Sequence, residues 1–158
     1  MQAIPPIPAE LLSAYRDADY VVEHPGGAFA LRIGQASAAL QALMEDARAS
    51  TAAFVTAHNP RSEPASDADN ASAQAALEAD LRVMGLRWIP GEGRDRSGNW
   101  RAERSALLLG VSLREARGLA RRYGQHAFVW IGAPDGVCTL RLVPQRRSSR
   151  GPADPAAR

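Results

Sequence analysis

The feature that most constrains the fold is an apolar run followed by a well-capped helix. Residues 52–57 form an apolar run of strand length. Ser66 is placed to cap the N-terminus of a helix expected at 67–84, and Gly85 is suited to end it. The apolar stretch 86–89 then predicts a second strand. This order favours a sheet with helices packed against it.

Similar patterns extend over the rest of the chain. Ser37 can cap a helix at 37–48, and Ser112 and Glu115 have the spacing of a capping box for a helix at 112–123. The other expected elements are a short helix at 8–18, strands at 20–23, 28–33, 99–109, 127–131 and 137–143, and a polar loop at 90–98. We therefore predict a compact α+β sandwich with a mixed sheet of about six or seven strands. Its three main helices are expected to cover mainly one face.

Length and composition indicate one domain. A chain of 158 residues that is 46% hydrophobic has room for a single core, which we place at residues 10–143 between an extension at 1–9 and a basic tail at 144–158. No apolar stretch approaches the roughly 20 residues needed to cross a bilayer, and the N-terminus lacks the pattern of a secretory signal. We expect a cytoplasmic protein.

Several classes of site are disfavoured by residue usage. All 19 basic residues are arginine, which excludes a lysine Schiff base and the lysine of a P-loop. The single Cys138 excludes an intramolecular disulfide. His24, His58 and His126 match no metal-ligand spacing, and the segment 91–93 lacks the third glycine of a dinucleotide fingerprint. We expect neither a metal nor a cofactor.

The charge is distributed unevenly along the chain. Four arginines and one aspartate follow Pro144, whereas residues 1–143 carry fifteen arginines against sixteen acids. The tail has too little apolar surface to fold by itself, so we predict that it is disordered. Because phosphate binding requires clustered cations, nucleic acid is expected to bind only weakly, through the tail.

A first group of candidate ligand-binding residues follows the strand at 52–57. It consists of Thr56, His58, Asn59 and Arg61, with Asn70 on the inner face of the next helix. A strand end and a helix N-terminus that meet at one crevice suit a polar or anionic ligand, and Arg61 offers a guanidinium fork. In the alternative interpretation, Asn59 and Pro60 form a turn and Asn70 only satisfies backbone groups.

A second group lies at the start of the strand expected at 99–109. Alternation places Glu103 and Ser105 on one face and Trp100 on the other. A partly buried Glu103 needs a partner or a raised pKa. The alternative to a role in acid–base chemistry is pairing with Arg61, Arg101 or the loop at 91–98. Trp100 either contacts a ligand or closes a core edge. Gln125, after the last main helix, is expected to turn inward toward Glu103 or Asn70.

Several short segments follow one another in a characteristic order. They are Leu31-Arg32-Ile33-Gly34, Phe54 to Pro60, Asn70, Gly85, Gly91, Trp100 with Glu103 and Ser105, Gly110, and Gly124 to Trp130. This order resembles the bacterial domain of unknown function 3293 family over residues 10–143. The resemblance implies a small bacterial cytoplasmic domain with no established activity, so no catalytic residues follow from it. An aromatic residue is common in that family where this chain has His58, and a proline is common near Arg104.

We therefore expect a domain that binds a polar or anionic, nucleotide-like small molecule. One alternative is a protein-interaction or regulatory module in which the same polar residues only brace loops. A third is a small acid–base enzyme using His58 and Glu103, which requires both side chains to reach a common point. The candidate ligand-binding residues are Thr56, His58, Asn59, Arg61, Asn70, Trp100, Glu103, Ser105 and Gln125.

Overall fold

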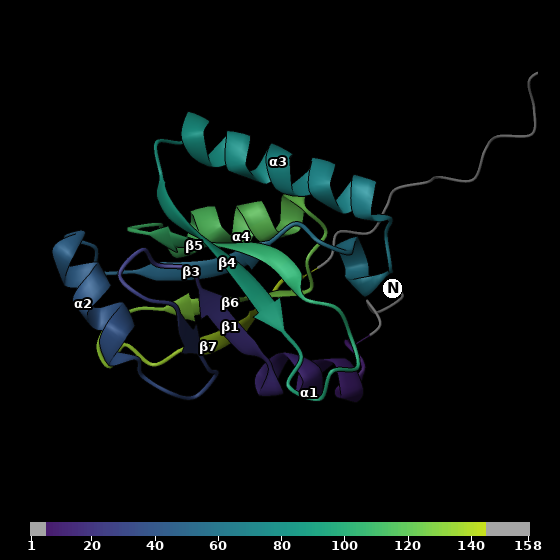
Figure 1. Cartoon of the computed structure of the whole chain (residues 1–158), viewed down its shortest axis with the longest axis horizontal. Coiled ribbons are helices and arrows are strands. Elements are labelled where there is room, and N and C mark those ends of the chain that lie inside the picture. Colours follow the sequence, from purple (N-terminus) through teal and green to yellow (C-terminus); the bar gives the residue numbers. More distant parts are fainter. Residues whose placement is uncertain (1–5, 145–158) are drawn as a thin grey trace, which may run out of the picture.

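The structure is a computed structural model that describes residues 6–144 (Figure 1). The predicted basic tail, from residue 145 onward, lies outside the described residues. The helices are α1 (Ala9–Asp17), α2 (Ala38–Asp46), α3 (Asp67–Val83) and α4 (Leu113–Arg122), with a 3-10 turn at Pro60–Ser62. The strands are β1 (Asp19–Val22), β2 (Phe29–Leu31), β3 (Ala52–Thr56), β4 (Arg87–Arg94), β5 (Glu103–Leu109), β6 (Ala127–Ile131) and β7 (Thr139–Leu142).

The centre of the sheet consists of two interleaved β–α–β units. In the first, α3 connects β3 to β4, and in the second, α4 connects β5 to β6. The strand order β4-β5-β3-β6 places one strand between the two members of each unit. This is the topology of a ferredoxin-like βαββαβ core.

Additional strands extend this core at both edges. The β1–β2 hairpin adds next to β4, and β7 adds next to β6, to give a seven-stranded sheet. The α+β class and the predicted strand number are therefore confirmed. The predicted mixed pairing is wrong, since every strand pair within residues 6–144 is antiparallel. Each helical crossover skips one strand position, so strands that run in the same direction are never neighbours.

The helices cover both faces of the sheet, which corrects the prediction of one main covered face. On one face, Leu77 and Leu81 of α3 and Leu119 of α4 pack in a buried cluster with alternate residues of β3 and β5. On the other face, Leu40 and Met44 of α2 pack in a second buried cluster. Figure 1 shows α3 at the top of the molecule, α2 at the side and α1 at the bottom.

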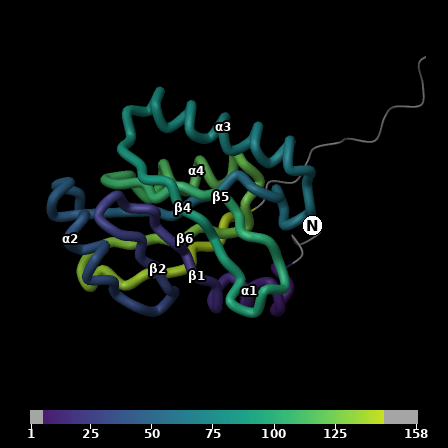
Figure 2. The backbone as a smooth tube through the Cα atoms, in the orientation of Figure 1, coloured from purple at the N-terminus to yellow at the C-terminus, as the bar shows by residue number. Residues whose placement is uncertain are grey.

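The sheet curls until its two outer edges approach each other (Figure 2). The segment after β2 meets the segment before β7 through a bridge between Ala36 and Val137. The backbone N–H of Gly34 donates to the carbonyl of Cys138 at 2.8 Å, and the N–H of Cys138 donates to the carbonyl of Gln35 at 3.0 Å. The α2 face is therefore the inside of a half-barrel.

The predicted caps of the main helices are confirmed. The Ser37 and Ser66 side chains accept from the backbone N–H of the third residue onward, and Ser112 and Glu115 form a reciprocal capping box. Gly124 follows α4 with φ +67°, a left-handed conformation that glycine adopts without strain. These local signals account for the close agreement between expected and observed helix bounds.

The boundary between β4 and β5 differs from expectation. β4 continues to Arg94 through the segment expected to be a loop, because it pairs with β1 on one side and β5 on the other. β5 begins at Glu103, and the loop before it is organised by Asp95. That carboxylate accepts hydrogen bonds from the backbone N–H groups of Ser97, Asn99 and Trp100.

Candidate functional site

The candidate residues converge where three strands meet. β3 ends at Thr56, β5 begins at Glu103, and β6 begins two residues after Gln125, at Ala127. The antiparallel register places Thr56 directly opposite Ser105. Polar side chains from segments that are distant in sequence are thereby gathered at one end of the half-barrel.

A cavity of about 240 Å³ lies at this end. Its floor is formed by the inner face of the sheet, and α1 covers it. Most of its lining side chains are apolar or aromatic. Seven of the nine candidate residues line it: Thr56, His58, Asn59, Trp100, Glu103, Ser105 and Gln125. That they contact a ligand stays a prediction.

Asn59 and Asn70 connect the cavity wall to α3. The backbone N–H of Asn59 donates to Asn70 Oδ1 at 2.8 Å, and Asn70 Nδ2 donates to Asn59 Oδ1 at 2.9 Å. The same Asn59 oxygen accepts from the N–H of Ala65 at 3.0 Å, while Asn59 Nδ2 donates to Glu103 Oε1 at 3.0 Å. Asn70 is buried and lies beside the cavity, so it positions Asn59, as the bracing interpretation predicted.

The turn after Asn59 directs Arg61 away from this site. Asn59, Arg61 and Ser62 all have positive φ, and the N–H of Arg61 donates to the carbonyl of Gly124 at 2.7 Å. The Arg61 side chain is exposed and lines a surface hollow beside the end of α4. Arg61 therefore does not line this cavity together with the other candidates, and its contact with an anion stays a prediction.

Glu103 is half-buried among uncharged groups. Burial raises the pKa of its carboxyl above the usual value, and the hydrogen bond from Asn59 only partly opposes this effect. The Ser105 hydroxyl donates to the Glu103 carbonyl at 3.0 Å. Its predicted arginine partner is not observed within residues 6–144, where the salt bridges of Arg101 and Arg104 are made with Asp67 and Glu23.

His58 is held by its backbone and by Thr56. The N–H of His58 donates to Thr56 Oγ1 at 3.1 Å, and the Thr56 hydroxyl donates to the Arg104 carbonyl at 2.7 Å. Burial, followed by the positive charge of Arg104, lowers the pKa of His58, and Asp67 opposes this effect. Its Nδ1 atom is buried without a hydrogen-bond partner among the described residues. His58 and Glu103 line the same cavity, so they are not on opposite faces of the sheet.

Gln125 turns inward as predicted. It is 9% exposed, and its Nε2 donates to the carbonyls of His58 at 2.9 Å and Tyr123 at 3.1 Å. This amide therefore fixes the backbone of the cavity wall as well as lining it.

Helix α1 and strand β1 contribute residues to the cavity that were not predicted from the sequence. Leu11, Ala14 and Tyr15 of α1 line the cavity together with Tyr20 of β1. The Tyr15 hydroxyl lies 2.7 Å from Ser62 Oγ, and the Tyr20 hydroxyl donates to the Tyr15 carbonyl. Burial raises the pKa of both tyrosines. The apolar face of the helix expected at 8–18 could have indicated this contribution, because such a face packs against other apolar surface.

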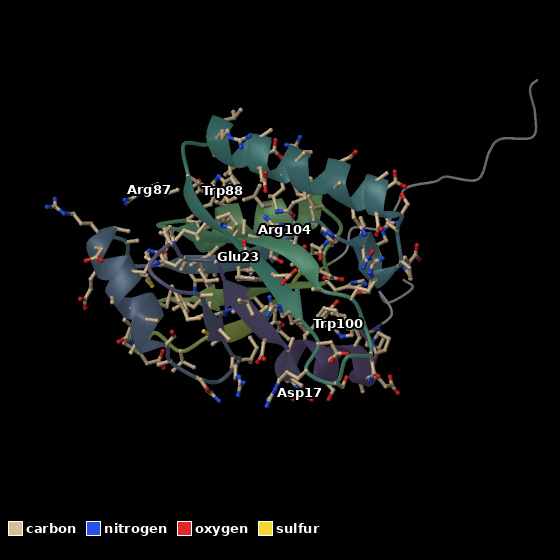
Figure 3. All side chains as sticks on the ribbon, in the orientation of Figure 1. Asp17, Glu23, Arg87, Trp88, Trp100 and Arg104 are labelled. Atoms are coloured by element: carbon tan, nitrogen blue, oxygen red, sulfur yellow. The ribbon has the colours of Figure 1, made fainter. Side chains whose placement is uncertain are left out.

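A second hollow, of about 660 Å³, adjoins the cavity on the side of α3. We call it the α3 groove. It shares Trp100, Asn59 and Glu103 with the cavity, so these side chains form the wall between the two spaces. Figure 3 shows Trp100 on the loop before β5, near α1. Gln74 of α3 lines the groove, and both polar atoms of its amide are buried without a hydrogen-bond partner among the described residues.

Within residues 6–144, no cluster of three or more His, Cys, Asp or Glu side chains is arranged to hold a metal ion. None of the helices in that part of the chain combines the length and apolar character needed to cross a membrane.

Comparison with known proteins gives one match. Residues 55–128 match the family model described as protein of unknown function (DUF3293). No curated protein and no solved structure matches the chain. The matched segment begins within β3 and ends within β6, so it covers most of the βαββαβ core, including Asn59, Asn70, Glu103 and Gln125. This match supports the assignment of the chain to the DUF3293 family.

Proposed function

We propose that the cavity binds a small aromatic molecule that is uncharged or cationic and carries N–H donors. The observation that supports this proposal most is the composition of the cavity wall. Among residues 6–144, no arginine lines the cavity, and the acidic residue that lines it is Glu103. Aromatic and aliphatic walls with a few polar groups are typical of small-molecule sites.

The size of the cavity limits the ligand. A protein cavity of roughly 150 Å³ is sufficient to hold benzene. A volume of about 240 Å³ therefore suits a bicyclic ring and excludes a complete nucleotide. The aromatic part of the nucleotide-like prediction is retained, and the anionic part is not, since Arg61 lies elsewhere.

Glu103 is the expected anchor. Its Oε1 atom already accepts from Asn59, and Oε2 has no hydrogen-bond partner among the described residues. A carboxylate in an apolar site is stabilised most by a ligand group that donates a hydrogen bond to it. Tyr20 and Phe54 form an edge-to-face pair with ring centroids 5.4 Å apart, which provides an aromatic wall next to the ligand.

Acid–base catalysis is a second candidate, because His58 and Glu103 line one cavity and their pKa values are displaced in opposite directions, toward neutral forms. An imidazole and a carboxyl group that line one cavity can exchange protons with a shared substrate.

The interaction-module alternative predicted that backbone groups would satisfy the amides and that no cavity would lie between them. The cavity beside Asn59 and Gln125 favours ligand binding instead.

Thermal unfolding with adenine, indole and tryptamine tests the proposal, with indole-3-acetate as the anionic comparator. A bound probe at 100 times its Kd raises the unfolding free energy by about 2.7 kcal/mol. Ala127→Leu, which fills the cavity from β6, should abolish this shift, and Ala30→Leu at an exposed strand position is the matched control. A shift by indole-3-acetate alone, or an unchanged shift in Ala127→Leu, would contradict the proposal.

A further inference from the structure

The α3 groove contains a buried amide that has no hydrogen-bond partner within residues 6–144. Gln74 lies on the inner face of α3, between Asn70 and Leu77, and is only 6% exposed. Neither its Nε2 nor its Oε1 has a hydrogen-bond partner among the described residues. Buried polar groups in folded proteins are nearly always hydrogen-bonded, so this amide calls for a partner from outside the chain.

The arginines of the groove do not make it an anion site. It is lined by two arginines and by acidic side chains, but Arg101 pairs with Asp67 at 3.2 Å and Arg104 pairs with Glu23 at 3.2 Å. Figure 3 shows Arg104 and Glu23 side by side near the centre of the sheet. Because both arginines already pair with carboxylates, an uncharged ligand fits the groove better than an anion does.

The amide of Gln74 specifies the hydrogen-bonding pattern of the ligand. A glutamine side chain presents one carbonyl oxygen and one NH₂ group side by side. A single partner satisfies both only if its own N–H and C=O lie on the same edge. Cyclic amides and primary carboxamides have this edge, whereas a trans peptide bond directs its N–H and C=O to opposite sides.

We propose that the α3 groove is a second binding site, which takes an uncharged cyclic amide or primary carboxamide through a paired hydrogen bond to Gln74. The rings of His58 and Trp100 and the small side chains of Ala71 and Ala75 line the space around this amide. The proposal does not depend on the ligand of the cavity, since Gln74 does not line the cavity.

Two probes of nearly equal shape test the proposal on the unaltered full-length chain. 2-Pyrrolidinone has the required edge, and N-methyl-2-pyrrolidinone lacks the N–H. In titrations of ¹⁵N-labelled protein, 2-pyrrolidinone should shift the side-chain NH₂ resonances of Gln74 and bind at least tenfold more tightly than its N-methyl analogue. Equal affinities, or no shift at Gln74, would overturn the proposal and leave water as the partner of the amide.

Gln74→Met supplies the matched variant, because methionine has a similar shape and no amide. It should weaken 2-pyrrolidinone binding at least tenfold while the melting temperature stays equal or rises. Gln41→Met, at an exposed position of α2, should leave binding unchanged. Undiminished binding in Gln74→Met would refute the site. If only the resonances of Phe54 and Tyr20 shifted, the probe would be bound in the cavity. That result would contradict the proposed site in the α3 groove without affecting the proposed function of the cavity.

Discussion

The Asn59 side chain donates a hydrogen bond to Glu103 at 3.0 Å and thereby joins the end of β3 to the start of β5. Asn59 also exchanges two hydrogen bonds with Asn70 of α3. The pair forms part of the wall between the cavity and the α3 groove. Its integrity should therefore affect both the stability of the fold and the shape of both spaces.

Removing the Asn59 side chain should destabilise the protein. Asn59→Gly deprives Asn70 and Glu103 of a partner, and buried polar groups left unsatisfied cost about 1–3 kcal/mol each. We expect urea denaturation to show a loss of about 2–4 kcal/mol.

Asn59→Ala separates the backbone contribution from the side-chain contribution. Asn59 has φ +45°, which alanine adopts at a cost of about 1–2 kcal/mol and glycine does not. Asn59→Ala should therefore be less stable than Asn59→Gly by about that amount. Equal stability of the wild type and Asn59→Gly would show that the hydrogen-bond network contributes nothing.

The carboxyl of Glu103 should make stability fall as pH rises. Burial raises its pKa in the folded state, so in the window above pH 4.5 the folded protein holds a proton that the unfolded chain has lost. Relative to Glu103→Gln, the wild type should thus lose unfolding free energy as pH rises through this window. Glu115 is a control of opposite sign, because the capping-box hydrogen bonds lower its pKa. Parallel pH profiles of wild type and Glu103→Gln would contradict this expectation.

His58 should produce the opposite pH dependence. Burial lowers the pKa of His58 in the folded state below its unfolded value of 6.5. At a pH between the folded-state and unfolded-state pKa values, the unfolded chain binds more protons than the folded protein, so stability falls on acidification. His58→Phe removes both this dependence and the buried Nδ1 atom that has no partner. Thermal unfolding in a Glu103→Gln background should show a flatter profile below pH 6.5 for His58→Phe. An identical slope in both proteins would assign the titration to another group.

Gly91 and Gly93 provide a matched pair on β4. A Cβ at Gly91 would lie 2.7 Å from the Phe54 ring and 2.7 Å from the carbonyl of Val21, whereas a Cβ at Gly93 meets nothing within 4 Å. Gly91→Ala should destabilise the protein by about 1–3 kcal/mol, the usual cost of overpacking, and Gly93→Ala should be nearly neutral. Chemical denaturation of both variants checks this difference. Similar losses of stability in both variants would mean that alanine is unfavourable in this part of β4 whatever its side-chain contacts.

The local parts of the fold could be predicted from the sequence. Ser66, Ser112 and Gly124 act through groups within four residues, so helix ends follow from nearby residues alone. The strand order and the side of the sheet covered by α2 depend on contacts between distant segments. No short pattern distinguishes the antiparallel sheet from the expected mixed one, and the continuation of β4 through Pro90 depends on its two neighbouring strands.

The same distinction applies to the candidate site. Thr56, Asn59, Glu103 and Gln125 could be found because each one precedes, follows or begins a recognisable strand or helix. Arg61 was misplaced because three positive φ angles in the turn are not evident from the sequence. Gln74 was missed although it lies four residues after Asn70 on the same helical face.

The interleaved strand order has a consequence for synthesis on the ribosome. The hairpin of β1 and β2 emerges early, but the strand that holds it, β4, is made only after α3. Until then, one side of that hairpin offers unpaired backbone groups to any neighbouring chain. The contact between Gly34 and Cys138 forms later still. Slow translation between these segments should therefore increase aggregation of the nascent chain, and chaperone dependence should be greatest before β4 has emerged.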